Sequence, residues 1–300
     1  MILNEMIKEF PTVLIKANEP LSFYTYTKTG GPADILAFPK TEDEIVKLVA
    51  WIKAQQLPLT VLGNASNLIV KDGGIRGVVM ILTEMNQMQV KKEKLTVQSG
   101  AKLIDTSYRA WSEGLTGLEF ACGIPGSIGG AVFMNAGAYE GEISEVLESA
   151  LVISETGEVT RLSNEDLDFS YRYSSIQKHH GIILEAVFQL KKGNKATIKT
   201  RMDELTALRE AKQPLEFPSC GSVFKRPTGY FTGKLIQEAG LQGKIWGGAQ
   251  ISEKHAGFIV NINEATATDY IELIAYIQEI ILTNTGVKLE TEVRIIGEDK

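Results

Sequence analysis

The chain has 300 residues, and its 44% hydrophobic and 23% charged residues are typical of an ordinary globular protein of two or three domains. Its formal net charge of −6 argues against a nucleic-acid-binding protein, which would present a basic surface. No apolar run approaches the ~20 residues of a membrane span, and the N-terminus lacks the apolar core of a signal peptide. Cys122 and Cys220 are too few for a disulfide framework. We therefore expect a cytoplasmic monomer with free thiols and neither a nucleic-acid nor a membrane partner.

The first 85 residues are expected to form a small α/β unit. Thr41 and Glu44 form a capping-box pattern, and apolar residues follow at i, i+3, i+4 and i+7, so residues 42–55 predict an amphipathic helix. The short strands that we expect around this helix cover 35–38, 58–62 and 77–82.

A second unit is expected over 86–194. It begins with a strand at 95–99 and a helix over 102–113, which Gly114 ends. Further strands are predicted near 150–154, 159–162 and 182–190.

The third expected unit covers 195–300. Its first helix, 196–211, has four apolar residues on one side, namely Ile198, Met202, Leu205 and Leu208. A strand at 258–262 leads to a helix over 268–283. A last strand, 289–296, alternates charged and apolar residues, which would place Glu290, Glu292 and Arg294 on one face.

The most informative segment is the run from Gly123 to Gly137, which contains five glycines, one proline and one serine among apolar residues. Glycine lets a backbone approach a ligand closely, and successive bare N–H groups bind anions. A second loop of small polar residues, Gly63 to Asn67, follows the strand at 58–62, where ligands gather in α/β folds. Either loop alone could be a tight connection, but the two together predict a large diphosphate ligand.

Three further runs contain residue types suited to catalysis. Arg172 stands among tyrosines, as in a site that binds a carboxylate or phosphate, although it could equally be a surface arginine stacked on Tyr171. Gly221 allows the backbone to turn so that the Ser222 hydroxyl points into a cleft, and Glu292 belongs to the last strand. By residue type alone, an exposed turn and a solvated strand edge explain Ser222 and Glu292 better. The three histidines and two cysteines show no metal-ligand spacing, so we expect no metal site, and the cysteines are expected to fill small spaces.

In this order, the motifs closely resemble those of the UDP-N-acetylenolpyruvoylglucosamine reductases, over residues 22–297. The resemblance rests on Thr27-Lys-Thr-Gly-Gly-Pro-Ala33, Gly63-Asn-Ala-Ser-Asn67, Gly123-Ile-Pro-Gly-Ser-Ile-Gly-Gly130, Asn135-Ala-Gly-Ala138, Tyr171-Arg-Tyr-Ser174, Gly221-Ser-Val-Phe-Lys225 and Leu289-Glu-Thr-Glu-Val-Arg294. The glycine-rich pieces are shared with other flavoproteins of the p-cresol methylhydroxylase and vanillyl-alcohol oxidase type. The other runs are more specific to this family.

The resemblance implies an α+β flavoprotein of three domains, in which two FAD-binding subdomains precede a C-terminal substrate-binding domain. It implies non-covalent FAD, with NADPH as co-substrate, and reduction of the enolpyruvyl ether of UDP-N-acetylglucosamine to UDP-N-acetylmuramate in peptidoglycan synthesis. The cofactor-binding residues that it implies are Gly63, Asn64, Ala65, Ser66, Asn67, Gly123, Ile124, Pro125, Gly126, Ser127, Gly129, Gly130, Asn135 and Gly137.

The resemblance also assigns catalytic roles. Arg172 and Glu292 match the family's catalytic arginine and glutamate, which would stabilise the enolate that forms when flavin N5 delivers hydride. Glu292 could do so only if it is protonated or acts through water. Ser222 matches the proton-donating serine and would act as general acid.

The sequence departs from many relatives at two positions, with Lys28 in place of arginine and Arg226 in place of asparagine. Only about ten residues separate Arg172 from the strand at 182–190, so the inserted tyrosine-bearing loop of one subclass is missing and the chain resembles the shorter second subclass. Lys212, Lys225 and Arg226 are then candidates for binding the substrate diphosphate. Two alternatives are a flavin oxidoreductase of the same fold acting on a sugar or hydroxy acid, and a non-catalytic nucleotide-sugar sensor.

Overall fold

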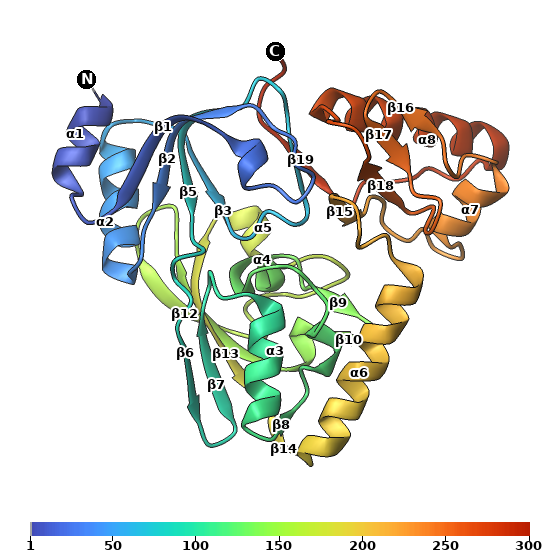
Figure 1. Ribbon diagram of the computed structural model, residues 1–300. Helices are drawn as coiled ribbons and strands as arrows, with labels where there is room; N and C mark the ends of the chain where they lie inside the picture. The colour runs from blue at the N-terminus through green and yellow to red at the C-terminus, as the bar shows by residue number, and fades with distance from the viewer. Residues whose placement is uncertain (1) are drawn as a thin grey trace. The chain divides into compact units, whose positions relative to one another are not determined.

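The computed structural model describes residues 2–300, which form two compact units (Figure 1). Unit 1 contains the residues up to Ala17 together with Ile35–Asn64 and Gly77–Arg209. Unit 2 contains Asn18–Asp34, Ala65–Arg76 and Glu210–Lys300. Each unit combines helices with sheets, as expected for the α+β class. The three domains expected at 1–85, 86–194 and 195–300 stay a prediction.

The first sheet has the strand order β1-β2-β5-β3. Helix α2 (Glu42–Ala54) begins at Thr41, whose side chain accepts the Glu44 N–H while the Glu44 carboxylate accepts the Thr41 N–H, so the predicted capping box is confirmed. Its buried face packs in one core with Val78 and Met80 of β5. The strands are β1 (Leu14–Pro20), β2 (Pro32–Phe38), β3 (Leu59–Leu62) and β5 (Ile75–Ile81), of which β3 and β5 are parallel.

The second sheet of unit 1 is antiparallel, with the order β12-β11-β13-β7-β6, and confirms the strands predicted for this region. Helix α4 (Ile128–Phe133) packs on β13 and β7 and buries Ile128, Ala131 and Val132. Helix α4 is not predicted from the sequence, because its neighbouring glycines are poor helix formers. The other elements are β6 (Met88–Lys91), β7 (Lys94–Gln98), α3 (Leu103–Ser112), β11 (Leu147–Ile153), β12 (Val159–Ser163) and β13 (Ile182–Gln189).

Helix α6 (Lys195–Lys212) confirms the helix predicted over 196–211, and it buries Ile198, Met202 and Leu205. The prediction that Leu208 shares this face is wrong, because its side chain is 40% exposed.

Unit 2 contains an antiparallel sheet of order β15-β18-β17-β16, with α7 (Thr232–Glu238) and α8 (Ala267–Thr285) in the same core. The predicted strand at 258–262 and helix at 268–283 are confirmed. Helix α8 begins with a capping box at Thr266 and ends at Gly286, whose φ of 72° favours glycine. The strands are β15 (Ser219–Ser222), β16 (Ile245–Trp246), β17 (Ala249–Ile251) and β18 (Phe258–Asn261).

The continuous strand predicted over 289–296 is wrong. Only β19 (Arg294–Ile296) is a strand, and it pairs in parallel with β4 (Leu68–Val70). Before it, Thr291 bridges Phe224, and the N–H groups of Glu292 and Val293 both donate to the Val223 carbonyl. Glu292 and Val293 thus both lie opposite Val223, which is the geometry of a β-bulge. The bulge interrupts the alternation of side chains between the two faces of the strand.

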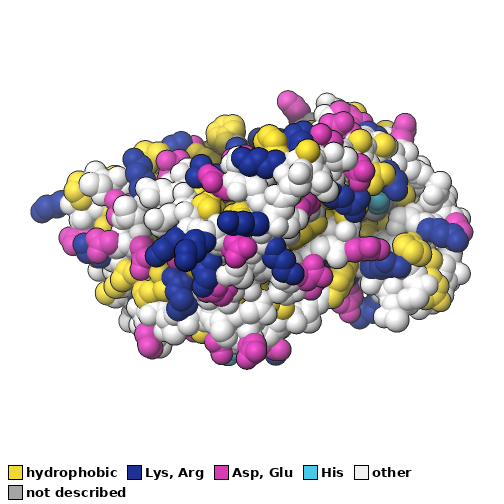
Figure 2. All heavy atoms as spheres, turned by 90° about the horizontal axis from the view of Figure 1, so that it is seen from below, with side chains coloured by type: hydrophobic (Ala, Val, Ile, Leu, Met, Phe, Trp, Pro, Cys, Tyr) yellow, Lys and Arg dark blue, Asp and Glu magenta, His cyan; other side chains and the backbone are white. Residues whose placement is uncertain are grey.

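Short elements complete the chain. They are α1 (Ile2–Glu9), β8 (Leu115–Thr116), β9 (Gly137–Ala138), β10 (Gly141–Glu142), α5 (Ile176–His179), β14 (Lys191–Lys192) and the 3₁₀ turns Leu21–Phe23, Glu119–Ala121 and Ile143–Glu145. Lysine and arginine side chains lie interspersed with aspartate and glutamate on the face shown in Figure 2. None of the helices within residues 2–300 has the length and apolar character needed to cross a membrane.

Candidate functional site

The first two residues of the Gly63–Asn67 loop lie against the glycine-rich segment within unit 1. Gly63 directly follows β3, and a Cβ atom at this position would collide with the Ser127 hydroxyl. The Asn64 amide donates a hydrogen bond to the Pro125 carbonyl. Only hydrogen fits at Gly63, so Gly63, Asn64 and the segment 125–127 form one continuous backbone surface.

The start of α4 is tied into the fold. The Ser127 hydroxyl accepts the Gly130 N–H at 3.3 Å, as an N-cap. The N–H groups of Ile128 and Gly129 donate to carbonyls of the β7–α3 connection at 2.9 and 2.7 Å. The expectation of bare N–H groups is therefore wrong at 128–130, where capping and tertiary hydrogen bonds use them.

Ser99 directly follows β7, and its side-chain hydroxyl is buried. The residue is 1% exposed, and its hydroxyl has no hydrogen-bond partner within residues 2–300. It lies next to Gly129, where a Cβ atom would come within 3.1 Å of the Ser99 Cβ. An unsatisfied buried hydroxyl costs about 1–3 kcal/mol, and a ligand oxygen or nitrogen would remove that cost. The Gly63 surface and this hydroxyl fit a large polar ligand such as FAD.

Arg172 is half-buried in unit 1 and is held by its backbone and side chain. It has a positive φ of 56° in the turn between Ser170 and Tyr173, and its Nη2 donates to the Gly137 carbonyl at 3.0 Å. Its guanidinium also lies 5.2 Å from the centre of the Tyr171 ring. Arg172 therefore stacks on Tyr171, and its hydrogen bond to Gly137 also fixes it beside the end of the glycine-rich segment.

Asn135 is fully buried and uses its side-chain amide inside unit 1. Its Nδ2 donates to the Ser170 carbonyl at 3.1 Å, and its Oδ1 accepts the Ser144 N–H at 2.9 Å. Its φ of 43° is one that asparagine tolerates better than most residues. Asn135 therefore positions the turn that carries Arg172.

Ser222 and Glu292 lie on neighbouring chain segments of unit 2. Ser222 is exposed at the end of β15 and follows Gly221, whose φ of 78° and open surroundings provide the predicted turn. The Glu292 N–H donates to the Val223 carbonyl at 2.8 Å. The bulge at Glu292 thus places this residue beside the Ser222 strand.

The three candidates for substrate binding also belong to unit 2, and each has a protein neighbour. Lys225 pairs with Glu290 at 3.4 Å, and the Arg226 guanidinium lies 3.9 Å from the centre of the Phe231 ring. Lys212 is exposed near His255, whose pKa is lowered by burial and by the positive charge of Lys212.

The remaining predicted cofactor residues have mainly backbone roles. Ala65 is buried with a φ of 47°, and Ser66 is half-buried. The Asn67 amide donates to the Glu292 carbonyl at 3.2 Å within unit 2. The Ile124 N–H donates to the Ala121 carbonyl, the Gly126 carbonyl accepts the Leu103 N–H, and a Cβ at Gly123 would crowd the Arg209 side chain.

The cysteines are both free and buried. Burial raises the pKa of the Cys122 thiol, and it raises that of Cys220 to about 12. Neither is a thiolate at neutral pH, in keeping with the packing role expected from the sequence.

Two buried polar groups of unit 1 were not predicted from the sequence. The Tyr173 hydroxyl is buried without a hydrogen-bond partner within residues 2–300, as is that of Ser99. The available signals were the position of Tyr173 next to Arg172 and that of Ser99 at the end of a predicted strand. Neither position reveals that a hydroxyl is left unsatisfied.

Known protein families match both parts of the sequence. A family model described as FAD binding domain matches residues 33–163, and one described as UDP-N-acetylenolpyruvoylglucosamine reductase, C-terminal domain, matches residues 213–296.

Individual proteins match over almost the full length. The chain is 62% identical over 294 residues to a UDP-N-acetylenolpyruvoylglucosamine reductase from Enterococcus faecalis, covering 98% of both sequences. It is 59% identical to one from Listeria monocytogenes, covering 99% of this chain and 100% of that protein. The crystal structure of UDP-N-acetylenolpyruvylglucosamine reductase from Thermus caldophilus has a TM-score of 0.80 at 35% identity, covering 94% of this chain and 98% of that chain.

Proposed function

The chain belongs to the UDP-N-acetylenolpyruvoylglucosamine reductase family, and from this premise we propose that it reduces the enolpyruvyl ether of UDP-N-acetylglucosamine to UDP-N-acetylmuramate in peptidoglycan synthesis. The observation that carries the proposal is 62% identity over 98% of both chains to a relative with that name. The protein is an FAD-containing oxidoreductase with NADPH as the reductant.

We propose that the surface formed by Gly63, Asn64 and the segment 125–127 holds FAD without a covalent bond. Support comes from the close approach of backbone at Gly63 and from the unsatisfied Ser99 hydroxyl. When bound, FAD accepts a hydride from NADPH and supplies it to the vinyl carbon of the substrate. The protein has to bind the substrate, balance the charge that develops on it and provide a proton.

Arg172 is proposed to stabilise that charge. Hydride addition to the vinyl carbon moves negative charge onto the neighbouring carboxylate, and a preorganised guanidinium lowers the energy of such a state. The hydrogen bond to Gly137 and the turn held by Asn135 limit how far Arg172 can move. This preorganisation supports the role, because the charge needs no rearrangement during the reaction.

Ser222 is proposed to donate the proton, with Glu292 assisting. Ser222 is exposed at the Gly221 turn, so its hydroxyl is accessible to a ligand. A serine is a weak acid, and the high basicity of the enolate has to drive the transfer. Glu292 acts here only as a neutral acid or through a water molecule, since a bare carboxylate would repel the enolate.

The test follows the two half-reactions by stopped-flow absorbance of the flavin band. NADPH should reduce the flavin, and the enolpyruvyl substrate should reoxidise it with formation of UDP-N-acetylmuramate. Reoxidation by a sugar or hydroxy acid instead would support a different oxidoreductase, and a protein without turnover would support a nucleotide-sugar sensor. The Glu292→Gln variant should retain FAD and substrate but reoxidise more slowly.

We further propose a cytoplasmic monomer in which Lys212, Lys225 and Arg226 contact the substrate diphosphate. Lys225→Met and Arg226→Met should each weaken UDP binding in a calorimetric titration while leaving the FAD content unchanged. Light scattering of the purified enzyme measures its mass against the 32.9 kDa of one chain.

A further inference from the structure

The buried face of α6 ends in an arginine. Within unit 1, this face buries Ile198, Met202 and Leu205, which are spaced by four and three residues. The next position of the stripe is Arg209, four residues after Leu205. A charged group thus stands where the helical period calls for an apolar residue, while Leu208 is exposed.

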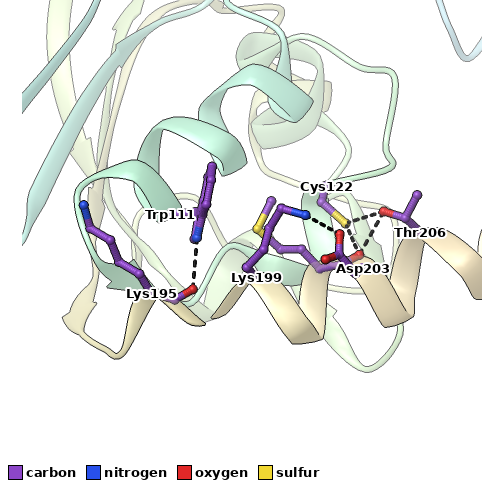
Figure 3. A network of polar contacts seen from close by, with 7 residues as sticks. Trp111, Cys122, Lys195, Lys199, Asp203 and Thr206 are labelled. Atoms are coloured by element: carbon purple, nitrogen blue, oxygen red, sulfur yellow. Dashed lines mark hydrogen bonds and ion pairs between the residues drawn. The ribbon is translucent and has the colours of Figure 1, made fainter. Parts of the chain in front are cut away.

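Contacts along its length hold α6 against unit 1 (Figure 3). The indole N–H of Trp111 donates to the Lys195 carbonyl at 3.0 Å. Further along, the Cys122 thiol lies 3.6 Å from the Met202 carbonyl and 3.7 Å from the Thr206 hydroxyl. These contacts fix the rotation of α6, so the direction in which Arg209 leaves the helix is also fixed.

Arg209 lies against the first glycine of the glycine-rich segment. A Cβ atom on Gly123 would come within 2.7 Å of the Arg209 Cδ, so a side chain at 123 would displace the arginine. The arginine stem therefore occupies the space that Gly123 leaves open.

Arg209 is a half-buried cation that has no hydrogen-bond acceptor among residues 2–300. Within residues 2–300, its guanidinium makes neither a hydrogen bond nor an ion pair, and burial lowers its pKa. Burying an unpaired charge is costly, so an arginine in such a place normally has an anionic partner. Three other arginines of unit 1 have a carboxylate partner, as Arg109 does in Glu113, Arg161 in Glu185 and Arg201 in Glu204.

We propose that Arg209 binds a phosphate of the diphosphate ligand held by the glycine-rich segment, and that this ligand is FAD. The assignment to FAD rests on the proposed function, whereas the need for an anion rests on Arg209 itself. A guanidinium suits this role because it can donate two parallel hydrogen bonds to phosphate oxygens. The substrate also contains a diphosphate, so the experiment has to distinguish a phosphate of FAD from a phosphate of the substrate.

The experiment titrates FAD into the full-length apoprotein and measures flavin fluorescence. Arg209→Met keeps the aliphatic part of the side chain but removes the charge. Arg209→Lys keeps the charge but lacks the paired N–H donors of the guanidinium. We expect Arg209→Met to raise the Kd for FAD about 10- to 100-fold, with Arg209→Lys in between. Arg201→Met, on the same helix but in a surface ion pair with Glu204, is the matched control and should change the Kd less than about twofold.

Two further measurements exclude a packing effect and identify the ligand. Riboflavin lacks phosphate, so its affinity should be equal in Arg209→Met and in the wild type, and the apo variant should melt no lower than the wild-type apoprotein. An unchanged Kd for FAD overturns the proposal. If the Kd for UDP rises instead, Arg209 serves the substrate diphosphate and the assignment to FAD is wrong. FAD binding is measured here without turnover, so a failure of the proposed reaction is seen separately, in the enolpyruvyl assay.

Discussion

The glycine-rich region of unit 1 and the Ser222–Glu292 region of unit 2 use their polar groups in different ways. In unit 1, the side chains of Asn64, Ser127 and Asn135 are all hydrogen-bonded to backbone of the same unit. In unit 2, Ser222 is exposed, and backbone hydrogen bonds define its surroundings. The proposed cofactor platform is therefore part of the packed fold, whereas the proposed acid stands on its surface. Mutations should affect folding in the first region and chemistry in the second.

The largest effect is expected at Ser222. Ser222→Ala should slow reoxidation of the reduced flavin by the enolpyruvyl substrate by about 10²–10⁴-fold, because a general acid is lost. Reduction by NADPH should stay fast, and stopped-flow absorbance resolves the two steps. Stability should hardly change, since Ser222 is exposed.

Ser222→Cys serves as the control, since a thiol can donate a proton from nearly the same place. It should recover part of the lost rate. Equal slowing of both half-reactions in Ser222→Ala would instead indicate a damaged flavin site. It would contradict the expectation that mutations in the Ser222–Glu292 region affect only the chemistry.

Two asparagines give the next largest effect. Asn135→Ala should lower the free energy of unfolding by about 2–3 kcal/mol, because it loses two hydrogen bonds and places alanine at a positive φ. Asn67→Ala in unit 2 loses a single side-chain hydrogen bond and should cost about 1 kcal/mol. Urea denaturation of the apoproteins measures both. A loss of FAD from Asn135→Ala without loss of stability would make Asn135 a direct ligand.

The third comparison uses two glycines of unit 1. Gly63→Ala should weaken FAD binding at least tenfold and also lower the melting temperature of the apoprotein, because its methyl group meets the Ser127 hydroxyl. Gly130 is exposed, and apart from neighbouring backbone of its own helix, an added Cβ would meet only the Ser127 Oγ, at 3.4 Å, among residues 2–300. Gly130→Ala should therefore leave the apoprotein stable. If it weakens FAD binding as well, the ligand itself approaches Gly130.

The smallest effect concerns acid stability. Burial by itself would raise the pKa of Asp72, but hydrogen bonds from Thr268 and Ala267 at the start of α8 outweigh it, and the pKa is lowered from its ordinary value of 3.8. A lowered pKa stabilises the fold above pH 3.8, and this stabilisation disappears as the pH falls through the folded-state value. Because solvent screens this partly exposed carboxylate, Asp72→Asn should cost at most about 1 kcal/mol at pH 7 and nothing once Asp72 is protonated. Equal destabilisation at both pH values would contradict the role of the charge.

Regular periodic segments of the fold could be predicted from the sequence. Helix α2 is predictable because Thr41 and Glu44 cap it and its apolar residues repeat with the helical period. The interruption at Glu292 could not be predicted, because a bulge depends on the Val223 carbonyl, which is distant in sequence. Helix α4 was missed for a similar reason, since contacts with β7 and β13 outweigh the poor propensity of its glycines.

The residues of the candidate site were easier to predict from the sequence than the contacts that they make. Gly63 and Ser127 belong to the two glycine-containing loops that were predicted to bind one ligand, and the two residues are in close contact. The internal use of the Asn135 amide could not be foreseen, because its partner Ser170 is 35 residues away. Arg209 was hidden because helical spacing alone does not distinguish it from Leu208, and only the docking of α6 selects the buried position.

The chain passes between the two units five times, after residues 17, 34, 64, 76 and 209. Strand β19, close to the C-terminus, pairs with β4, which is synthesised more than two hundred residues earlier. During translation, Leu68–Val70 must therefore wait without this partner until residues 294–296 have left the ribosome. Unit 2 is therefore completed after unit 1, whose last residue is Arg209, and cutting the gene between α6 and β15 yields a C-terminal fragment that lacks β4.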